Sequence, residues 1–444
     1  MSTRIVVVGG GYVGMYTAQR LQGRLSAADA EITVIDPQPN MTYQPFLPEA
    51  TAGNIEPRHV VVPLRTVLRR CRVLTAEVTS ISHRNRVLTV RPPNGETYDV
   101  EYDLAVICPG SVSRVVPMPG LRETALEFKT IADAIRLRNH VLGRLDIAAS
   151  NPDPDARRRA LTFVFVGGGY AGVEAIAELE DMTRHAIGFI PTIAPTDTRW
   201  VLIDSAERIM PELSPAMARY TAARLAERGI DVRLATTLRS IDGGYVETSD
   251  GDRFAADTVV WTAGVRANPL LLQTDLPLDA AGRIICRADL TVVGVDGAFA
   301  AGDCAAVPDL TSPVPGATCS PSAQHALRQA KTLADNVVAA IHGRKLRPYR
   351  HAHAGSVASL GLYRGVAEIY GIKLRGPIAW LLHRAYHLSR MPTPNRKIRV
   401  LADWLLALAL GREVVSLGPP GPTSHAMQPT AVQRTDERLV SGNN

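Results

Sequence analysis

The chain has 444 residues, of which 46% are apolar, and a formal net charge of +6 at neutral pH. These values are typical of a globular protein of two or three domains, and they exclude a disordered or fibrous chain. Arg supplies most of the positive charge, but no nucleic-acid recognition motif accompanies it, so we expect no nucleic-acid partner. The five cysteines are an odd number and contain no C-x-x-C pair, which argues against a disulfide framework and against a zinc site.

The first predicted element is an apolar, β-branched run that ends in a glycine-rich loop, I-V-V-V-G-G-G-Y-V-G, with Gly9, Gly11 and Gly14. A strand that is apolar at every position is typical of a parallel sheet covered on both faces. In such a G-x-G-x-x-G loop the glycines allow a tight turn, a close approach to a pyrophosphate and close packing of the helix. Asp36 ends the next predicted strand, 22 residues after Gly14, where an acid suits the ribose hydroxyls.

The same pattern returns downstream in F-V-F-V-G-G-G-Y-A-G-V-E, with Gly167, Gly169 and Gly172. A strand after it, W-V-L-I-D, ends at Asp204, at a longer spacing than in the first copy. Each half then closes on a similar strand, D-L-A-V-I-C-P-G ending at Gly110 and D-T-V-V-W-T-A-G ending at Gly264. One such loop alone is weak evidence, because ordinary Gly-rich turns share it. Two copies in matching surroundings predict a duplicated domain that binds two dinucleotides.

A third stretch, T-V-V-G-V-D-G-A-F-A-A-G-D-C-A at 291–305, contains Gly302 and Asp303 in an A-x-G-D pattern. It resembles the second flavin motif of flavoprotein reductases with two dinucleotide folds. The resemblance implies that Asp303 accepts a hydrogen bond from the ribityl chain of FAD. It also implies an α/β fold with two Rossmann-like domains. The domains would be an FAD domain in two parts (1–118 and 266–345), an inserted NADH domain (119–265), an α+β interface or membrane-binding region (346–417) and a disordered tail (418–444).

The segment after Asp36 indicates which branch of that group this chain resembles. It contains no cysteine, so the disulfide reductases, which attack through a thiolate placed there, are excluded. The stretch M-T-Y-Q-P-F-L-P-E-A-T-A-G instead resembles the type II NADH:quinone oxidoreductases, as do W-T-A-G-V-R-A-N-P-L and the C-terminal region. The resemblance implies that hydride passes from NADH to bound FAD. Two electrons then pass to a membrane quinone, menaquinone or ubiquinone, without proton pumping.

The predicted acceptor helix departs from the family pattern A-Q-x-A-x-Q. In A-Q-H-A-L-R-Q-A, Gln324 matches the first glutamine, but Arg328 takes the place of the second. Arg328 could donate to a quinone carbonyl or favour an anionic acceptor, and both residues could simply lie on an amphipathic helix. Two other functions therefore stay open: an NADH-oxidising reductase with a different soluble acceptor, and an NADH-sensing flavoprotein with low turnover.

Two acids near the second glycine loop are further candidates. The resemblance implies that Glu174 lies between nicotinamide and flavin and acts in acceptor binding or proton delivery. It could instead only stabilise the helix N-terminus electrostatically. Asp204 suits a free 2′-hydroxyl and repels a 2′-phosphate, which predicts a preference for NADH, although Arg199 and Arg208 lie close in sequence.

The C-terminal third is basic and amphipathic. Between residues 369 and 402 there is no acid but there are seven cations: Lys373, Arg375, Arg384, Arg390, Arg396, Lys397 and Arg399. Together with Trp and Leu at helical spacing, they predict a helix pair that lies on an anionic membrane surface. The alternative is a domain or homodimer interface whose Arg side chains extend to water. No apolar run is long enough to span a bilayer, and a strand begins near residue 4, so we expect a cytoplasmic protein, peripheral on the inner face of the cell membrane.

Overall fold

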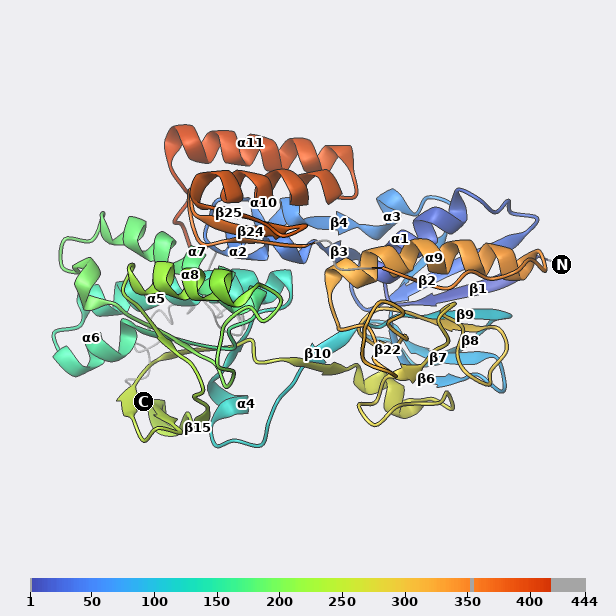
Figure 1. Cartoon of the computed structure of the whole chain (residues 1–444), viewed down its shortest axis with the longest axis horizontal. Coiled ribbons are helices and arrows are strands. Elements are labelled where there is room, and N and C mark those ends of the chain that lie inside the picture. Colours follow the sequence, from blue (N-terminus) through green and yellow to red (C-terminus); the bar gives the residue numbers. More distant parts are fainter. Residues whose placement is uncertain (1, 352–354, 417–444) are drawn as a thin grey trace, which may run out of the picture.

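The structure of the chain is a computed structural model that describes residues 2–351 and 355–416. Two lobes, each built on a parallel sheet, lie side by side, and two C-terminal helices lie along the upper edge of Figure 1. The predicted disordered tail, residues 418–444, lies outside the described residues.

The first lobe contains a five-stranded sheet of order β21-β9-β1-β2-β5, in which all neighbours run parallel. Its strands are β1 (Thr3–Val8), β2 (Ala30–Asp36), β5 (Arg72–Thr75), β9 (Leu104–Ile107) and β21 (Ala298–Ala300). Residues 5–8 are buried, as the unbroken apolar run predicts for a covered strand. Helices α1 (Tyr12–Gln22) and α9 (Ala323–Ile341) pack against each other on one side of this sheet (Figure 1).

Smaller elements complete the first lobe. An antiparallel sheet is formed by β6 (Glu77–Ser82), β7 (Val87–Arg91) and β8 (Tyr98–Glu101). The segment after β2 forms β3 (Asn40–Thr42), the short helix α2 (Leu47–Thr51), β4 (Val61–Pro63) and α3 (Leu64–Val67), with β3 and β4 paired. Late short strands are β20 (Ile284–Ile285) and β22 (Ala305–Ala306), which pair in parallel.

The chain crosses between the lobes on two paired strands. It leaves the first lobe through β10 (Ser111–Ser113) and returns through β19 (Val265–Ala267), and the two pair antiparallel. The second lobe is therefore an insertion in the first.

The second lobe repeats the parallel plan with the order β11-β18-β12-β13-β14. Its strands are β11 (Leu126–Glu127), β12 (Thr162–Val166), β13 (Arg199–Ile203), β14 (Ile230–Arg233) and β18 (Thr258–Trp261). Its helices are α4 (Leu121–Thr124), α5 (Ile131–Ser150), α6 (Pro154–Ala160), α7 (Tyr170–Ile187) and α8 (Pro215–Ala226). An antiparallel sheet of β15 (Leu238–Ser240), β16 (Tyr245–Thr248) and β17 (Arg253–Ala255) lies beside them.

The C-terminal region is α+β. An antiparallel sheet of β23 (Gly355–Ser359), β24 (Gly365–Ile369) and β25 (Ile372–Arg375) packs under α10 (Gly376–Arg390), which is followed by α11 (Pro394–Leu410). The prediction of two Rossmann-like domains with a C-terminal α+β region is confirmed. Among the residues described, no helix is both long and apolar enough to cross a bilayer.

Candidate active site

Three glycine motifs meet at one edge of the first sheet. Gly9, Gly110 and Gly302 follow β1, β9 and β21, which are adjacent parallel strands, so all three lie at the carboxyl edge. All three have positive φ, of 102°, 73° and 81°. In open parallel sheets this edge is where ligands bind.

The first glycine loop (Gly9–Gly14) is shaped by close backbone contacts. A Cβ at Gly9 would overlap the carbonyl oxygen of Cys108, and one at Gly14 would overlap that of Gly9. At Gly11 a Cβ would meet nothing within 4 Å, and no side chain caps the N-terminus of α1, which begins beside it. The loop therefore leaves open space in front of unpaired helix N–H groups, which is the arrangement that binds phosphate.

Asp36 closes the other side of this loop. One carboxylate oxygen accepts a hydrogen bond from the Gly10 N–H at 2.6 Å, and the other accepts from the Gln38 N–H at 2.7 Å. Burial raises the pKa of Asp36, and these two hydrogen bonds offset part of that rise. The acid thus lies beside the glycine loop, where a ribose would be held.

The second glycine loop (Gly167–Gly172) repeats this geometry. Gly167 has a φ of 112°, and a Cβ at Gly172 would overlap the Gly167 carbonyl oxygen. At Gly169 a Cβ would meet nothing within 4 Å, and α7 also begins without a side-chain cap. Asp204 accepts from the Gly168 N–H and, at 2.7 Å, from the Ala206 N–H. Gly264, with a φ of 82°, follows the neighbouring strand β18, as Gly110 follows β9.

Asp303 belongs to a polar group that includes residues the sequence did not single out. Its carboxylate accepts a hydrogen bond of 2.7 Å from the Ser111 hydroxyl, and Lys129 donates to that hydroxyl oxygen at 2.9 Å. Burial lowers the pKa of Lys129, and the charges of Asp303 and Glu127 oppose that change. Lys129 comes from the inserted lobe, so no motif of the flavin domain could indicate it.

Helix α9, which carries the predicted acceptor motif, presents three polar residues in different directions. Gln324 donates to the Gly355 carbonyl at 3.2 Å, and its amide oxygen lies 3.0 Å from Nε2 of His351. Arg328 donates to the Gln324 carbonyl at 3.0 Å. Gln329, which the motif did not assign, is buried and accepts from the Gly302 N–H at 2.7 Å. The glutamine that touches the flavin motif is therefore one position after Arg328.

Arg328 lines an open groove of about 720 Å³ between α1, α9 and the end of α10. The groove is strongly basic, since its lining includes Arg20, Arg328, Lys331, Arg350 and Arg390 with Asp335 as the only acid among the lining residues described. Asp335 already pairs with Arg20 at 2.9 Å.

Glu174 is buried where α7 meets β23 and α10. Its Oε1 accepts a hydrogen bond of 2.8 Å from the Ser359 N–H and lies 3.1 Å from Nε2 of the buried His383. The sequence analysis did not single out His383, which comes from a helix distant from Glu174 in the chain.

Comparisons with known proteins agree on one family. Residues 3–330 match the family described as pyridine nucleotide-disulphide oxidoreductase. A type II NADH:quinone oxidoreductase of Mycobacterium tuberculosis is 30% identical over 416 residues, which are 90% of this chain and 87% of that protein. Its Staphylococcus aureus counterpart is 28% identical over 378 residues, with 84% and 91% covered. The solved structure of NDH2 from Plasmodium falciparum in complex with NADH superposes with a TM-score of 0.86 at 17% identity, covering 94% of this chain and all of that one.

The chain belongs to the type II NADH:quinone oxidoreductase family. It is an FAD-dependent enzyme that oxidises NADH, which confirms the cofactors and the enzyme class predicted from the sequence. The residues present fit both cofactors, because each glycine loop offers open space at Gly11 or Gly169 beside a helix N-terminus and a ribose-side acid.

Asp204 gives a test of nucleotide preference in this type II NADH:quinone oxidoreductase. Its carboxylate, at the end of β13 beside Gly168, would repel a 2′-phosphate. We expect kcat/KM for NADH to exceed that for NADPH by at least about tenfold. Asp204→Ala should narrow this ratio, and Asp197→Ala, on an exposed turn before β13, should leave it unchanged. Comparable wild-type values for the two nucleotides would contradict the assignment.

Proposed function

We propose that this type II NADH:quinone oxidoreductase binds FAD at the first glycine loop and NADH at the second, and that its acceptor is menaquinone or ubiquinone. When bound, FAD accepts a hydride from NADH and passes two electrons to the quinone. The observation that carries the proposal is the pair of open glycine loops with matching acids, each at the carboxyl edge of its own parallel sheet. The paired strands β10 and β19, which join the lobes, limit how far the two loops can separate.

The protein binds and orients the two cofactors and excludes water from them, and the cofactors carry the redox chemistry. Asp36 and Asp204 hold the adenosine riboses. Asp303, which accepts a hydrogen bond from the Ser111 hydroxyl, would accept another from the ribityl chain of bound FAD, and Gln329 holds the backbone of Gly302 in place. Gln324 and Arg328 lie on the acceptor side, and Glu174 acts in acceptor binding or in proton delivery.

Rapid mixing separates this function from the alternatives. Anaerobic NADH should bleach the flavin absorbance quickly, and a quinone added next should restore it quickly. Fast bleaching followed by reoxidation only with another oxidant would indicate a different acceptor, in line with the positive charge of Arg328. A reduced complex that persists with every acceptor would indicate an NADH sensor and would contradict the proposal.

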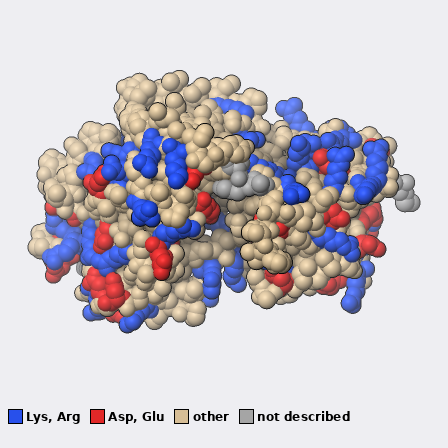
Figure 2. Space-filling model, viewed as in Figure 1, with Lys and Arg blue, Asp and Glu red and all other residues tan. Residues whose placement is uncertain are grey.

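We also propose that the C-terminal helices bind the inner face of the cell membrane. Large apolar side chains on α10 and α11 are exposed: Ile378, Leu381, Ile398, Leu401, Leu405, Leu406, Leu408 and Leu410. The upper face in Figure 2, over these helices, is mostly free of charged residues, and basic residues gather below it. An apolar face bordered by cations suits an anionic lipid interface. A homodimer that buries the same face is the competing proposal.

Replacing Leu405 and Leu408 together by Asp is expected to weaken binding to phosphatidylglycerol vesicles at least about tenfold, because each Leu buried in the interface contributes about 1.5–3 kcal/mol. Flotation with vesicles measures this. Leu272→Asp is the control, since Leu272 is equally exposed but lies in the first lobe, before β20. Unchanged flotation together with loss of a dimer in sedimentation would show that the face is a homodimer interface instead.

A further inference from the structure

A group of buried ionisable residues lies where both lobes meet the C-terminal region. We call Glu49 of α2, Glu174 and Glu178 of α7 and His383 of α10 the buried acid cluster. Glu178 is 0% exposed, Glu49 and His383 are 1% exposed, and Glu174 is 7% exposed. Burying an unpaired charge costs several kcal/mol per ion. A cluster of buried ionisable side chains is therefore a candidate for a functional role.

The charges of the cluster do not balance pair by pair. Glu49 accepts from Arg384 at 2.8 Å and from the Trp404 indole N–H at 2.8 Å. Glu174 lies beside His383. Glu178 has only neutral side-chain donors: Asn54 at 3.1 Å and the Ser359 hydroxyl at 2.7 Å. Among the described side chains, the third acid is therefore left without a cation in direct contact.

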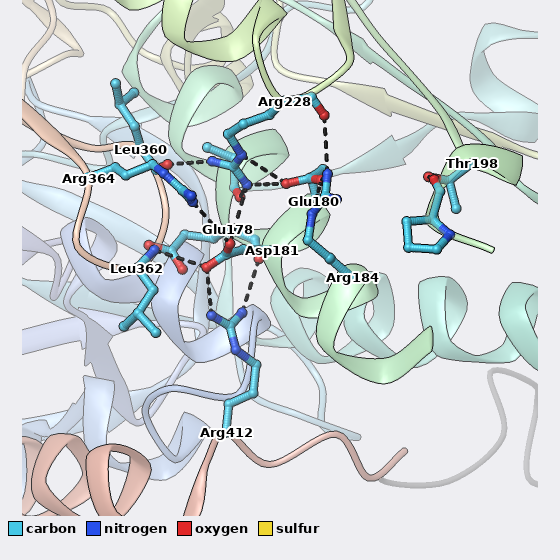
Figure 3. Close-up of polar contacts among 12 residues, drawn as sticks. Glu178, Glu180, Asp181, Arg184, Thr198, Arg228, Leu360, Leu362, Arg364 and Arg412 are labelled. Atoms are coloured by element: carbon cyan, nitrogen blue, oxygen red, sulfur yellow. Dashed lines mark hydrogen bonds and ion pairs between the residues drawn. The ribbon is translucent and has the colours of Figure 1, made fainter. Parts of the chain in front are cut away.

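Ser359 joins the two acids of α7. Its N–H donates to Glu174 and its hydroxyl to Glu178, and the two acids are one helical turn apart. On the outer side, Arg412 donates to the Glu178 carbonyl at 3.4 Å and to the Asp181 carboxylate at 2.8 Å. Figure 3 shows Glu178, Asp181 and Arg412 together at this edge.

On the inner side the cluster leads toward the first glycine loop. The rings of His383 and His387 lie 4.6 Å apart, and His387 packs edge-on against Tyr43 at 6.3 Å. Tyr43 lies 6.0 Å from Tyr12, the residue that follows Gly11. A continuous row of side chains thus connects Glu178 with the surroundings of the FAD loop.

Electrostatics raise the pKa of two groups of the cluster, Glu178 and His383. Burial, then the charge of Glu49, raises the pKa of Glu178 to about 7, although Arg412 and the Ser359 hydroxyl oppose this rise and Asp181 adds to it. For His383, burial lowers the pKa, but Glu174, Glu49 and Glu178 together raise it above its ordinary value. The neighbouring Arg384 is held by Glu49 and lies over the rings of Trp380 and Trp404.

The overall reaction takes up one proton from solution in addition to the hydride. NADH gives up a hydride, which is two electrons and one proton, and a quinone takes up two electrons and two protons to become a quinol. We propose that Glu178 supplies the second proton of the quinol and that His383 is a positioning residue that fixes the Glu174 side chain beside Ser359. The O–H bond of the Glu178 carboxyl breaks as its proton forms an O–H bond on a quinone oxygen, and a proton from solvent restores the carboxyl. This inference rests on the proposed function.

Infrared titration tests the cluster without turnover. In the oxidised wild-type protein a protonated-carboxyl band should disappear with a midpoint near pH 7, and Glu178→Gln should remove it. Glu49→Gln removes a negative charge and should lower that midpoint. Glu227→Gln is the control and should keep the band, because Glu227 is an exposed acid that pairs with the half-exposed Arg224. A wild-type protein without such a band would overturn the proposal.

Rapid-mixing kinetics provide a second test of the proposed proton donation by Glu178. Glu178→Gln should be bleached by NADH at the wild-type rate, and its reoxidation by quinone should be at least about tenfold slower. Reoxidation of the wild-type enzyme should slow as pH rises through about 7, because Glu178 then loses its proton. His383→Gln should shift this dependence of the reoxidation rate on pH, which a purely structural role would not do. If Glu178→Gln shows the wild-type reoxidation rate and the wild-type pH profile, proton donation by Glu178 is contradicted. A wild-type enzyme that no quinone reoxidises would instead contradict the proposed function. Proton donation by Glu178 to a quinone would then be contradicted too, even if the infrared band is present.

Discussion

Replacing Gly11 by Val is expected to give a folded protein that is colourless because it holds no FAD. Gly11 has a φ of −72°, which any residue adopts, and a Cβ there meets no protein atom within 4 Å. The fold therefore tolerates the side chain at a cost of about 1 kcal/mol as a helix N-cap. The same side chain fills the open space in front of the helix N–H groups, where the pyrophosphate must approach.

The equivalent change in the second loop should separate the two cofactors. Gly169→Val is expected to give a yellow protein whose flavin NADH no longer bleaches, because Gly169 has the same open surroundings. Visible spectra before and after anaerobic NADH measure both results. Gly143→Val, within α5 where a Cβ also meets nothing, should keep the flavin and its bleaching by NADH. Full flavin content in Gly11→Val would contradict the placement of FAD.

Arg228→Ala is expected to destabilise the inserted lobe by about 3–5 kcal/mol, because it leaves buried acceptors without their cation. The Arg228 side chain is only 8% exposed, and it pairs with Glu180 and donates to the Ala177 carbonyl at 2.7 Å and to the Leu360 carbonyl. Figure 3 shows it linking α7 to the turn between β23 and β24. A domain of this size should lose roughly 10 °C in Tm.

Arg224→Ala is the matched control for this change. Arg224 also pairs with an acid, Glu227, but both side chains are about half exposed, so its loss should cost at most about 1 kcal/mol. Differential scanning calorimetry of the two variants measures the difference between their Tm values. Equal shifts in Tm would show that the Arg228 network does not hold the inserted lobe to the C-terminal region.

The sequence predicted those parts of the site whose signals are local. Gly9, Gly11 and Gly14 follow a strand directly, and Asp36 ends the next strand of the same parallel sheet. Strand, turn and helix lie within one short segment, so their geometry follows from spacing alone. The second copy shares the strand, loop and helix, although Asp204 follows at a longer spacing, and Asp303 was indicated by the family resemblance. The family resemblance added the order of the domains, and the cations with Trp and Leu at helical spacing indicated the C-terminal helices.

The buried acid cluster could not be predicted in this way. Glu49, Glu178 and His383 come from three parts of the chain, and only tertiary packing brings them together. Gln329 shows the limit within one helix, since a shift of one residue changes which side chain faces Gly302. The family pattern aligns Arg328 with a glutamine, but it does not indicate which side of the helix each residue faces.

The visible spectrum of the purified protein, recorded before and after one equivalent of NADH without oxygen, tests the central claim most directly. If the two glycine loops hold FAD and NADH within reach of each other, the protein is yellow and one equivalent of NADH bleaches it. A protein that stays colourless after incubation with FAD, or a yellow protein that NADH leaves unchanged, would contradict the account.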